Sequence, residues 1–129
     1  MSENVELVHR AYAALQAGDI EEFLTYVAPD AEWHSLFEIG RRWEGHGGVR
    51  EWWAEVHQIF PDWKPSIVTA RSVGEHVIVH ARGVGTGAAS GVGIDQNFWQ
   101  VAKIEGDQIV WYCGVRSEQE ALKAAGLSE

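Results

Sequence analysis

The stretch YAALQAGDIEEFLTYVAPDAEWHS, residues 12–35, places two helices and a strand in close succession near the start of the chain. Residues 5–15 carry apolar side chains at helical spacing, and Gly18 marks the end of this first predicted helix. Asp19 begins a second, shorter helix with a capping-box pattern. Residues 30–37 follow and are predicted to form the first strand.

The rest of the chain adds a helix, a run of strands and a closing helix. Residues 49–60 carry an apolar stripe that predicts a third helix after the glycine-rich turn at 45–48. From residue 63 onward, four β-branched or aromatic runs are separated by glycine-containing turns, and Ser117 begins a last helix. Helices followed by consecutive strands indicate an α+β fold with an antiparallel sheet. The length of 129 residues favours a single domain over 1–129.

Composition and charge argue against several classes of protein. The net charge is −9 and the ten basic residues are scattered, so nucleic acid and acidic membrane surfaces are poor partners. No apolar run approaches the roughly 20 residues of a membrane span, and the polar N-terminus lacks the plan of a signal peptide. We therefore expect a cytoplasmic protein. Its seven tryptophans and four phenylalanines suit a core, a subunit interface or the lining of an apolar pocket.

Metal and phosphate sites are not predicted. The lone Cys113 excludes an intramolecular disulfide and any multi-cysteine metal site. His76 and His80 are four residues apart on a predicted strand, which separates them by roughly 13 Å, too far to share an ion. The glycine-rich segment 85–93 does not open a helix and carries no Lys–Ser/Thr pair, so it is interpreted as a hairpin rather than a phosphate loop. No metal or other cofactor is expected.

Three stretches in this order resemble one family. They are residues 12–35, 45–63 and 106–127, and the match as a whole runs over nearly the entire chain. The chain resembles the SnoaL-like polyketide cyclase and ketosteroid isomerase-like branch of the nuclear transport factor 2-like superfamily. This resemblance implies a cone-shaped, curved antiparallel sheet wrapped around three N-terminal helices, with a short C-terminal helix and one deep apolar pocket. It also implies a homodimer that forms through the sheet.

The chemistries of characterised relatives are not supported by the matching residues. Steroid isomerases use a tyrosine on the first helix and two aspartates on strands, with environments that separate the two pKa values. The matching residues here are Ala11, Ser35 and Gln100, and Tyr12 is expected to point elsewhere. A serine does not accept a carbon-bound proton near neutral pH without a neighbouring base. SnoaL-type cyclases use an aspartate and a histidine, where this chain has Gln100 and Gly87.

The resemblance and strand alternation together predict a mostly aromatic pocket. Such a pocket suits a planar apolar molecule with one or two oxygens, and a carboxylate on that molecule would pair with an arginine. In the alternative interpretation, the aromatic side chains simply fill the cone. Trp99 and Trp111 are expected on the outer face of the sheet, covered by a partner subunit. The predicted ligand-binding residues are Trp33, Ser35, Phe37, Trp53, Phe60, Phe98, Gln100, Tyr112 and Arg116.

Four residues are candidates for acid–base chemistry. Strand alternation that points Trp33 inward places His34 on the opposite face of the sheet, at a surface or dimer interface. If the strand register slipped by one residue, His34 would instead point into the pocket and could act as a base. His80 and Arg82 share one face of their strand, which points either to solvent or inward. If it points inward, His80 acts as the base, Arg82 holds an anionic group and Asp95 is the carboxylate partner. Arg82 and Asp95 are loosely similar to the Asp–Arg–Asp set of epoxide hydrolases.

Two functions are therefore compared. The first is a cofactor-free enzyme of isomerase, cyclase, dehydratase or hydrolase type that acts on a small apolar or aromatic molecule. The second is a non-catalytic small-molecule binding domain of the same fold. A pocket that contains a histidine within reach of a carboxylate would favour the enzyme. An apolar pocket whose polar groups are only Gln100 and Tyr112 would favour binding.

Overall fold

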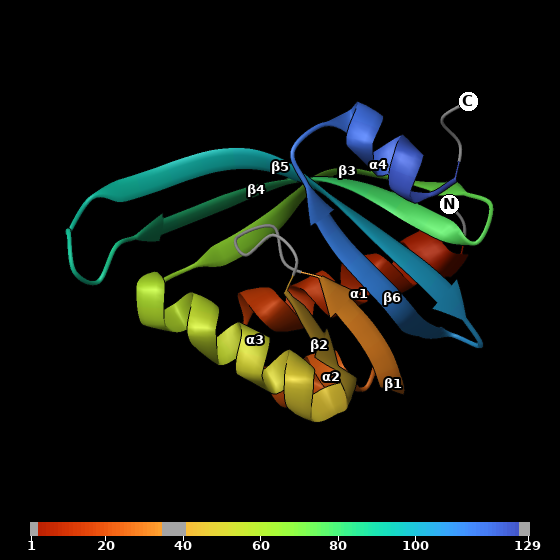
Figure 1. Ribbon diagram of the computed structural model, residues 1–129, viewed down its shortest axis with the longest axis horizontal. Coiled ribbons are helices and arrows are strands. Elements are labelled where there is room, and N and C mark those ends of the chain that lie inside the picture. Colours follow the sequence, from red (N-terminus) through yellow and green to blue (C-terminus); the bar gives the residue numbers. More distant parts are fainter. Residues whose placement is uncertain (1–2, 35–40, 127–129) are drawn as a thin grey trace.

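The computed structural model describes residues 3–34 and 41–126, which form four helices and one sheet (Figure 1). The predicted α+β class and the short C-terminal helix are confirmed. The elements in chain order are α1 (Glu3–Gln16), α2 (Ile20–Leu24), β1 (Val27–His34), β2 (Arg42–Glu44), α3 (Gly45–Ile59), β3 (Lys64–Val73), β4 (His76–Thr86), β5 (Gly93–Glu105), β6 (Gln108–Val115) and α4 (Glu118–Ala124).

The six described strands form one curved sheet in the order β2-β1-β6-β5-β4-β3. Neighbouring strands are antiparallel, except that β1 and β6 run parallel. The predicted antiparallel sheet therefore contains one parallel pair, which joins the first strand of the chain to the last. Because β2 and β3 are the two edges, the sheet curves around the helices without closing (Figure 1).

The two faces of the sheet are covered by different helices. The main core lies between the inner, concave face and α1, α2 and α3, whereas α4 packs on the outer face (Figure 1). Strand alternation divides the residues between them: Val77 and Val79 belong to the main core, and Ile78 belongs to the small cluster under α4. Trp99 and Trp111 also pack against that small cluster, so the chain's own helix provides part of the cover expected from a partner subunit. The homodimer stays a prediction.

The glycine-rich segment connects β4 to β5 in a long hairpin, as predicted, and its base packs on the end of α3. Trp63 lies flat against Gly83, where an added Cβ would approach the indole to 2.1 Å, so only glycine fits there. The carboxylate of Asp62 accepts a hydrogen bond of 2.6 Å from the backbone N–H of Thr86. The backbone N–H of Ala88 donates to the carbonyl of Ile59 at 2.9 Å. One side-chain and one backbone acceptor thus attach the hairpin to the end of α3 and to the loop that follows it.

Candidate functional site

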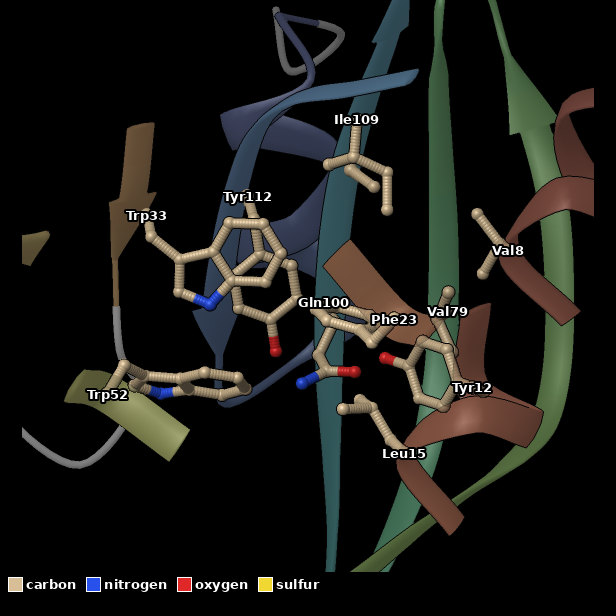
Figure 2. Close-up of a pocket in the computed structure, with 11 residues that line it drawn as sticks. Val8, Tyr12, Leu15, Phe23, Trp33, Trp52, Val79, Gln100, Ile109 and Tyr112 are labelled. Atoms are coloured by element: carbon tan, nitrogen blue, oxygen red, sulfur yellow. The ribbon is translucent and has the colours of Figure 1, made fainter. Parts of the chain in front are cut away.

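A small cavity lies between the inner face of the sheet and the helices (Figure 2). The space open to the centre of a water molecule is about 20 Å³, and roughly 10–15 Å³ is enough for one water. In this conformation the cavity therefore holds water but no larger molecule. The residues that line it are Val8, Tyr12, Leu15, Phe23, Trp33, Trp52, Val79, Gln100, Ala102, Ile109 and Tyr112.

Aromatic rings form one wall of the cavity. The parallel pairing of β1 and β6 sets Trp33 directly opposite Tyr112, and the two rings stack with centroids 4.2 Å apart and planes within 12°. Trp52 from α3 packs on both rings, at 5.5 and 5.9 Å, and Phe23 meets Trp33 edge-on at 5.8 Å. Such pairs stabilise packing by about 0.5–1.5 kcal/mol each beyond their buried area. The wall is therefore well ordered by contacts within the chain.

Three buried polar atoms at the cavity lack a hydrogen-bond partner within the described part of the chain. They are the hydroxyl of Tyr12, the indole nitrogen of Trp33 and the side-chain amide oxygen of Gln100. Figure 2 shows the Tyr12 and Tyr112 hydroxyls and the Gln100 amide directed toward the same space. Buried polar groups are nearly always paired, and an unpaired one costs about 1–3 kcal/mol. The cavity thus offers donors and an acceptor to a guest that contains oxygen.

The two tyrosines of the cavity are proton donors rather than bases. Burial raises the pKa of Tyr12. Burial also raises the pKa of Tyr112, and the nearby Tyr12 hydroxyl adds to that shift. Both phenols are therefore protonated at neutral pH. Among the described residues that line the cavity there is no carboxylate and no histidine.

The structure brings three of the predicted ligand-binding residues to the cavity: Trp33, Gln100 and Tyr112. Ser35 and Phe37 lie outside the described residues. Arg116 follows the end of β6, is exposed, and uses its backbone N–H to contact the Glu120 carboxylate, so the expected position in the pocket is wrong.

The remaining three predicted residues pack elsewhere in the main core. Phe98 and Phe60 lie against Trp63 at 5.9 and 5.8 Å, beneath the β4–β5 hairpin. Trp53 lies against His57, with ring centroids 4.2 Å apart. None of the three lines the cavity. Around Trp63 and His57, aromatic side chains therefore fill the interior instead of lining a pocket, as in the alternative interpretation.

His34 lies on the outer face of the sheet, on the side away from the cavity. Its Nε2 atom is 2.6 Å from the Glu32 carboxylate, and Arg42 approaches the same carboxylate at 3.6 Å. The hydrogen bond with His34 lowers the pKa of Glu32. About a third of each side chain in the His34–Glu32 pair is exposed. The histidine–carboxylate pair therefore exists, but the sheet separates it from the cavity.

His80, Arg82 and Asp95 are also on the outer face. His80 stacks on Trp99 with centroids 4.6 Å apart, and its Nε2 atom is 3.0 Å from the Asn97 side-chain oxygen. Arg82 donates two hydrogen bonds to Asp95, one of them 2.7 Å long, and this contact lowers the pKa of the Asp95 carboxyl. The structure brings Arg82 and Asp95 together as expected. The polar side of their strand points outward, because Val77, Val79 and Ala81 fill the inner side.

Tyr12 is the polar cavity residue that sequence reasoning missed, and Phe23 and Trp52 are aromatic ones. The expectation that Tyr12 points away from the pocket is wrong, because its ring lines the cavity. The signal was present in the sequence: Val8, Tyr12 and Leu15 recur at helical spacing and therefore share the face of α1 that meets the sheet. Alignment with the isomerase tyrosine directed attention to the neighbouring Ala11 instead.

Metal ligands and membrane-spanning helices were also sought in the structure. Within residues 3–34 and 41–126, no three His, Cys, Asp or Glu side chains are grouped so that they could hold a metal ion. No helix in these two segments has the length and apolar character needed to cross a membrane.

Comparison with known proteins identifies the family. A search of curated proteins finds no significant match. Among solved structures, a nuclear transport factor 2-like protein of unknown function from Burkholderia pseudomallei is similar, with a TM-score of 0.80 and 22% identity over 95% of this chain and 97% of that one. TerC, co-crystallised with polyporic acid, gives a TM-score of 0.79 and 21% identity over 98% of both chains.

A putative SnoaL-like polyketide cyclase from a Jannaschia species gives a TM-score of 0.75 and 19% identity, over 98% of this chain and 93% of that one. At such identities these likenesses establish the fold alone. The sequence itself matches the family model of the SnoaL-like domain over residues 8–112. The chain therefore belongs to the SnoaL-like domain family.

Proposed function

We propose that this protein binds a small, largely aromatic molecule at the cavity, which widens to admit it, and recognises the molecule through one or two oxygens without catalysing a reaction. The observation that carries this proposal is the set of three unpartnered polar atoms, from Tyr12, Trp33 and Gln100, in an otherwise apolar cavity. Ligand sites are typically apolar, with a few polar groups that fix the orientation of the ligand. A ligand hydroxyl would accept from the phenol or the indole and donate to the amide oxygen.

Binding is favoured over acid–base catalysis because the described cavity residues offer no base. General acid–base catalysis needs a group within hydrogen-bond reach of the proton that it moves. His34 and His80 both have partners on the outer face, and the sheet lies between them and the cavity. Within residues 3–34 and 41–126, the isomerase, cyclase, dehydratase and hydrolase alternatives therefore have no base at the cavity. The likeness to TerC, which was co-crystallised with polyporic acid, supports a small-molecule ligand in this fold.

The proposal is tested with phenol and toluene, which have nearly the same shape but differ in the hydroxyl group. Calorimetric titration should detect phenol binding and a weaker interaction with toluene. Gln100→Leu removes the acceptor and should weaken phenol binding by about two- to tenfold, the effect of one neutral hydrogen bond of roughly 0.5–1.5 kcal/mol. The matched control is Gln96→Leu, which makes the same change at an exposed position of β5.

Two results would contradict the proposal. Equal affinity for phenol and toluene would mean that the polar atoms of the cavity do not recognise the ligand. An equal loss of affinity in Gln96→Leu and Gln100→Leu would place the bound phenol elsewhere on the protein.

A further inference from the structure

A second, larger hollow lies beside the cavity, in the surface groove between α1 and β3. The space open to the centre of a water molecule is about 200 Å³ in the groove, against about 20 Å³ in the cavity. The groove is open to solvent and is lined by His9, Tyr12, Ala13, Gln16, Ser66 and Ile67. Tyr12 also lines the cavity, and it is the only described residue that lines both hollows. Tyr12 therefore borders both hollows.

Packing alone holds the Tyr12 side chain in place. Its hydroxyl is buried and has no hydrogen-bond partner among the described residues. Figure 2 shows the ring extending from α1 into the cavity, with the hydroxyl directed toward Gln100. A tyrosine on a helix has two accessible χ1 rotamers, so its ring can occupy two directions. A turn of the ring out of the cavity would bring the hydroxyl to the solvent-open groove, where water can hydrogen-bond to it.

The wall of the groove opposite α1 belongs to an edge strand with an irregular register. β3 ends the sheet, and its pairing with β4 shifts between Ile67 and Thr69, where the intervening Val68 is 51% exposed. A bulge of this kind bends the strand locally. At the same end of β3, the Gln16 side-chain amide donates to the Pro65 carbonyl at 3.0 Å and fixes the helix to the strand. The groove thus has one end fixed by a hydrogen bond and one wall bent by the bulge.

We propose that the ligand site consists of the cavity and the α1–β3 groove together, joined when the Tyr12 side chain turns out of the cavity. This inference rests on the proposed function, because it states where the bound molecule lies. The cavity by itself has room only for water, and displacement of Tyr12, which borders both hollows, would join it to the larger groove. The groove contributes polar side chains at its mouth, from His9, Gln16 and Ser66.

The arrangement of polar groups defines the class of ligand. The inner end of the ligand meets the indole N–H of Trp33 and the amide oxygen of Gln100, and the outer end of the ligand meets the polar rim of the groove. The part between these ends is enclosed by apolar and aromatic side chains. The ligand is therefore an elongated aromatic molecule with an oxygen at each end. Bisphenol A has this form and serves as the probe, whereas phenol reaches only one end.

Filling the groove from its exposed side tests the joined site without changing the core. Ala13 is exposed and lines the groove, whereas Arg10 is exposed on the same helix and does not. Ala13→Phe should weaken bisphenol A binding by roughly tenfold or more and leave phenol binding unchanged. Arg10→Phe should leave the binding of both probes unchanged. Ser66→Leu, with Thr69→Leu as its control, repeats the test from the strand side.

The possible outcomes separate the two proposals. If Ala13→Phe and Ser66→Leu bind bisphenol A as the unmodified protein does, the groove is not part of the site. Phenol binding without bisphenol A binding would also overturn the joined site, while the proposed function would stand. If Gln100→Leu leaves bisphenol A binding unchanged, the probe sits in the groove alone, and the joined site is wrong. If the unmodified protein binds neither probe, the proposed function fails and this inference fails with it.

Discussion

The two faces of the sheet differ sharply in chemistry, although residues that are adjacent in sequence supply both. On β1, Trp33 is fully buried against the cavity, while His34 is about one-third exposed and bonded to a carboxylate. On β4, Val79 lines the cavity and His80 stacks on an outer tryptophan. On the inner face, neutral polar groups of Tyr12, Trp33 and Gln100 have no partner among the described residues, whereas the outer face holds ion pairs such as Arg82–Asp95. A residue type therefore indicates a function here only after its face is known.

The largest expected effect is on the free energy of unfolding, which should fall more for a buried residue of the inner face than for a half-buried residue of the outer face. Trp33→Ala removes a fully buried ring that stacks on Tyr112, and it should lower the free energy of unfolding by about 3–5 kcal/mol. Trp99→Ala removes a half-buried ring on the outer face and should lower the free energy of unfolding by roughly 1–2 kcal/mol. Urea unfolding of both variants measures the difference. Equal losses would contradict the assignment of the two faces.

An intermediate effect concerns the unpartnered hydroxyl of Tyr12. Tyr12→Phe removes a buried polar group without a partner among the described residues, so the free energy of unfolding should rise by about 1–3 kcal/mol. The control Tyr26→Phe changes a half-buried tyrosine and should stay within about 0.5 kcal/mol of the unmodified protein. Urea unfolding measures both variants. A lower free energy of unfolding in Tyr12→Phe would show that the hydroxyl has a partner in solution.

The smallest expected effect is on the outer face and depends on pH. Arg82 holds the pKa of Asp95 below its usual 3.8, so the folded protein binds that proton more weakly than the unfolded chain. The stabilisation from this pair is present above about pH 4 and is lost as the pH falls through the folded pKa. Asp95→Asn should therefore flatten the loss of stability on acidification below about pH 4. At neutral pH its effect should be small, because both side chains are more than half exposed.

Acid unfolding curves measured by circular dichroism test this prediction. Arg82→Gln should flatten the curve in the same way as Asp95→Asn, and the double variant should add nothing to either single change. If both single variants lose stability below about pH 4 just as the unmodified protein does, the ion pair does not form in solution.

Most of the fold was predictable from local patterns. The helical spacing of apolar residues on α1 and α3 indicated both helices, and the glycine-rich segment 85–93 was correctly interpreted as part of a hairpin. These features depend on residues that are close in sequence, for which periodicity and turn chemistry are informative. The parallel pairing of β1 with β6 was not predicted, because it joins strands from opposite ends of the chain.

The candidate site was less predictable than the fold. Trp33, Gln100 and Tyr112 were identified through the resemblance and strand alternation, and all three line the cavity. Tyr12 was expected to point away from the pocket because the alignment with relatives matched their tyrosine to Ala11. The helical spacing of Val8, Tyr12 and Leu15 indicates instead that Tyr12 faces the core. Phe60 and Phe98 were expected at the pocket but pack on Trp63. For Phe98 on β5, strand alternation specifies a face and not a position along the cone, and for Phe60 at the end of α3, helical spacing has the same limit.

The sequence by itself determined the fold class and the residue types available for recognition, because these follow from composition, periodicity and local turn signals. It also determined the family, through its match to the model of the SnoaL-like domain. The tertiary structure alone decided which of those residues meet. Strand pairing placed Trp33 on Tyr112, and the packing of α1 placed Tyr12 between the cavity and the groove. The physical reason is that a cavity depends on the close packing of side chains from distant segments, so its size and its polar contacts exist only when the whole chain is folded.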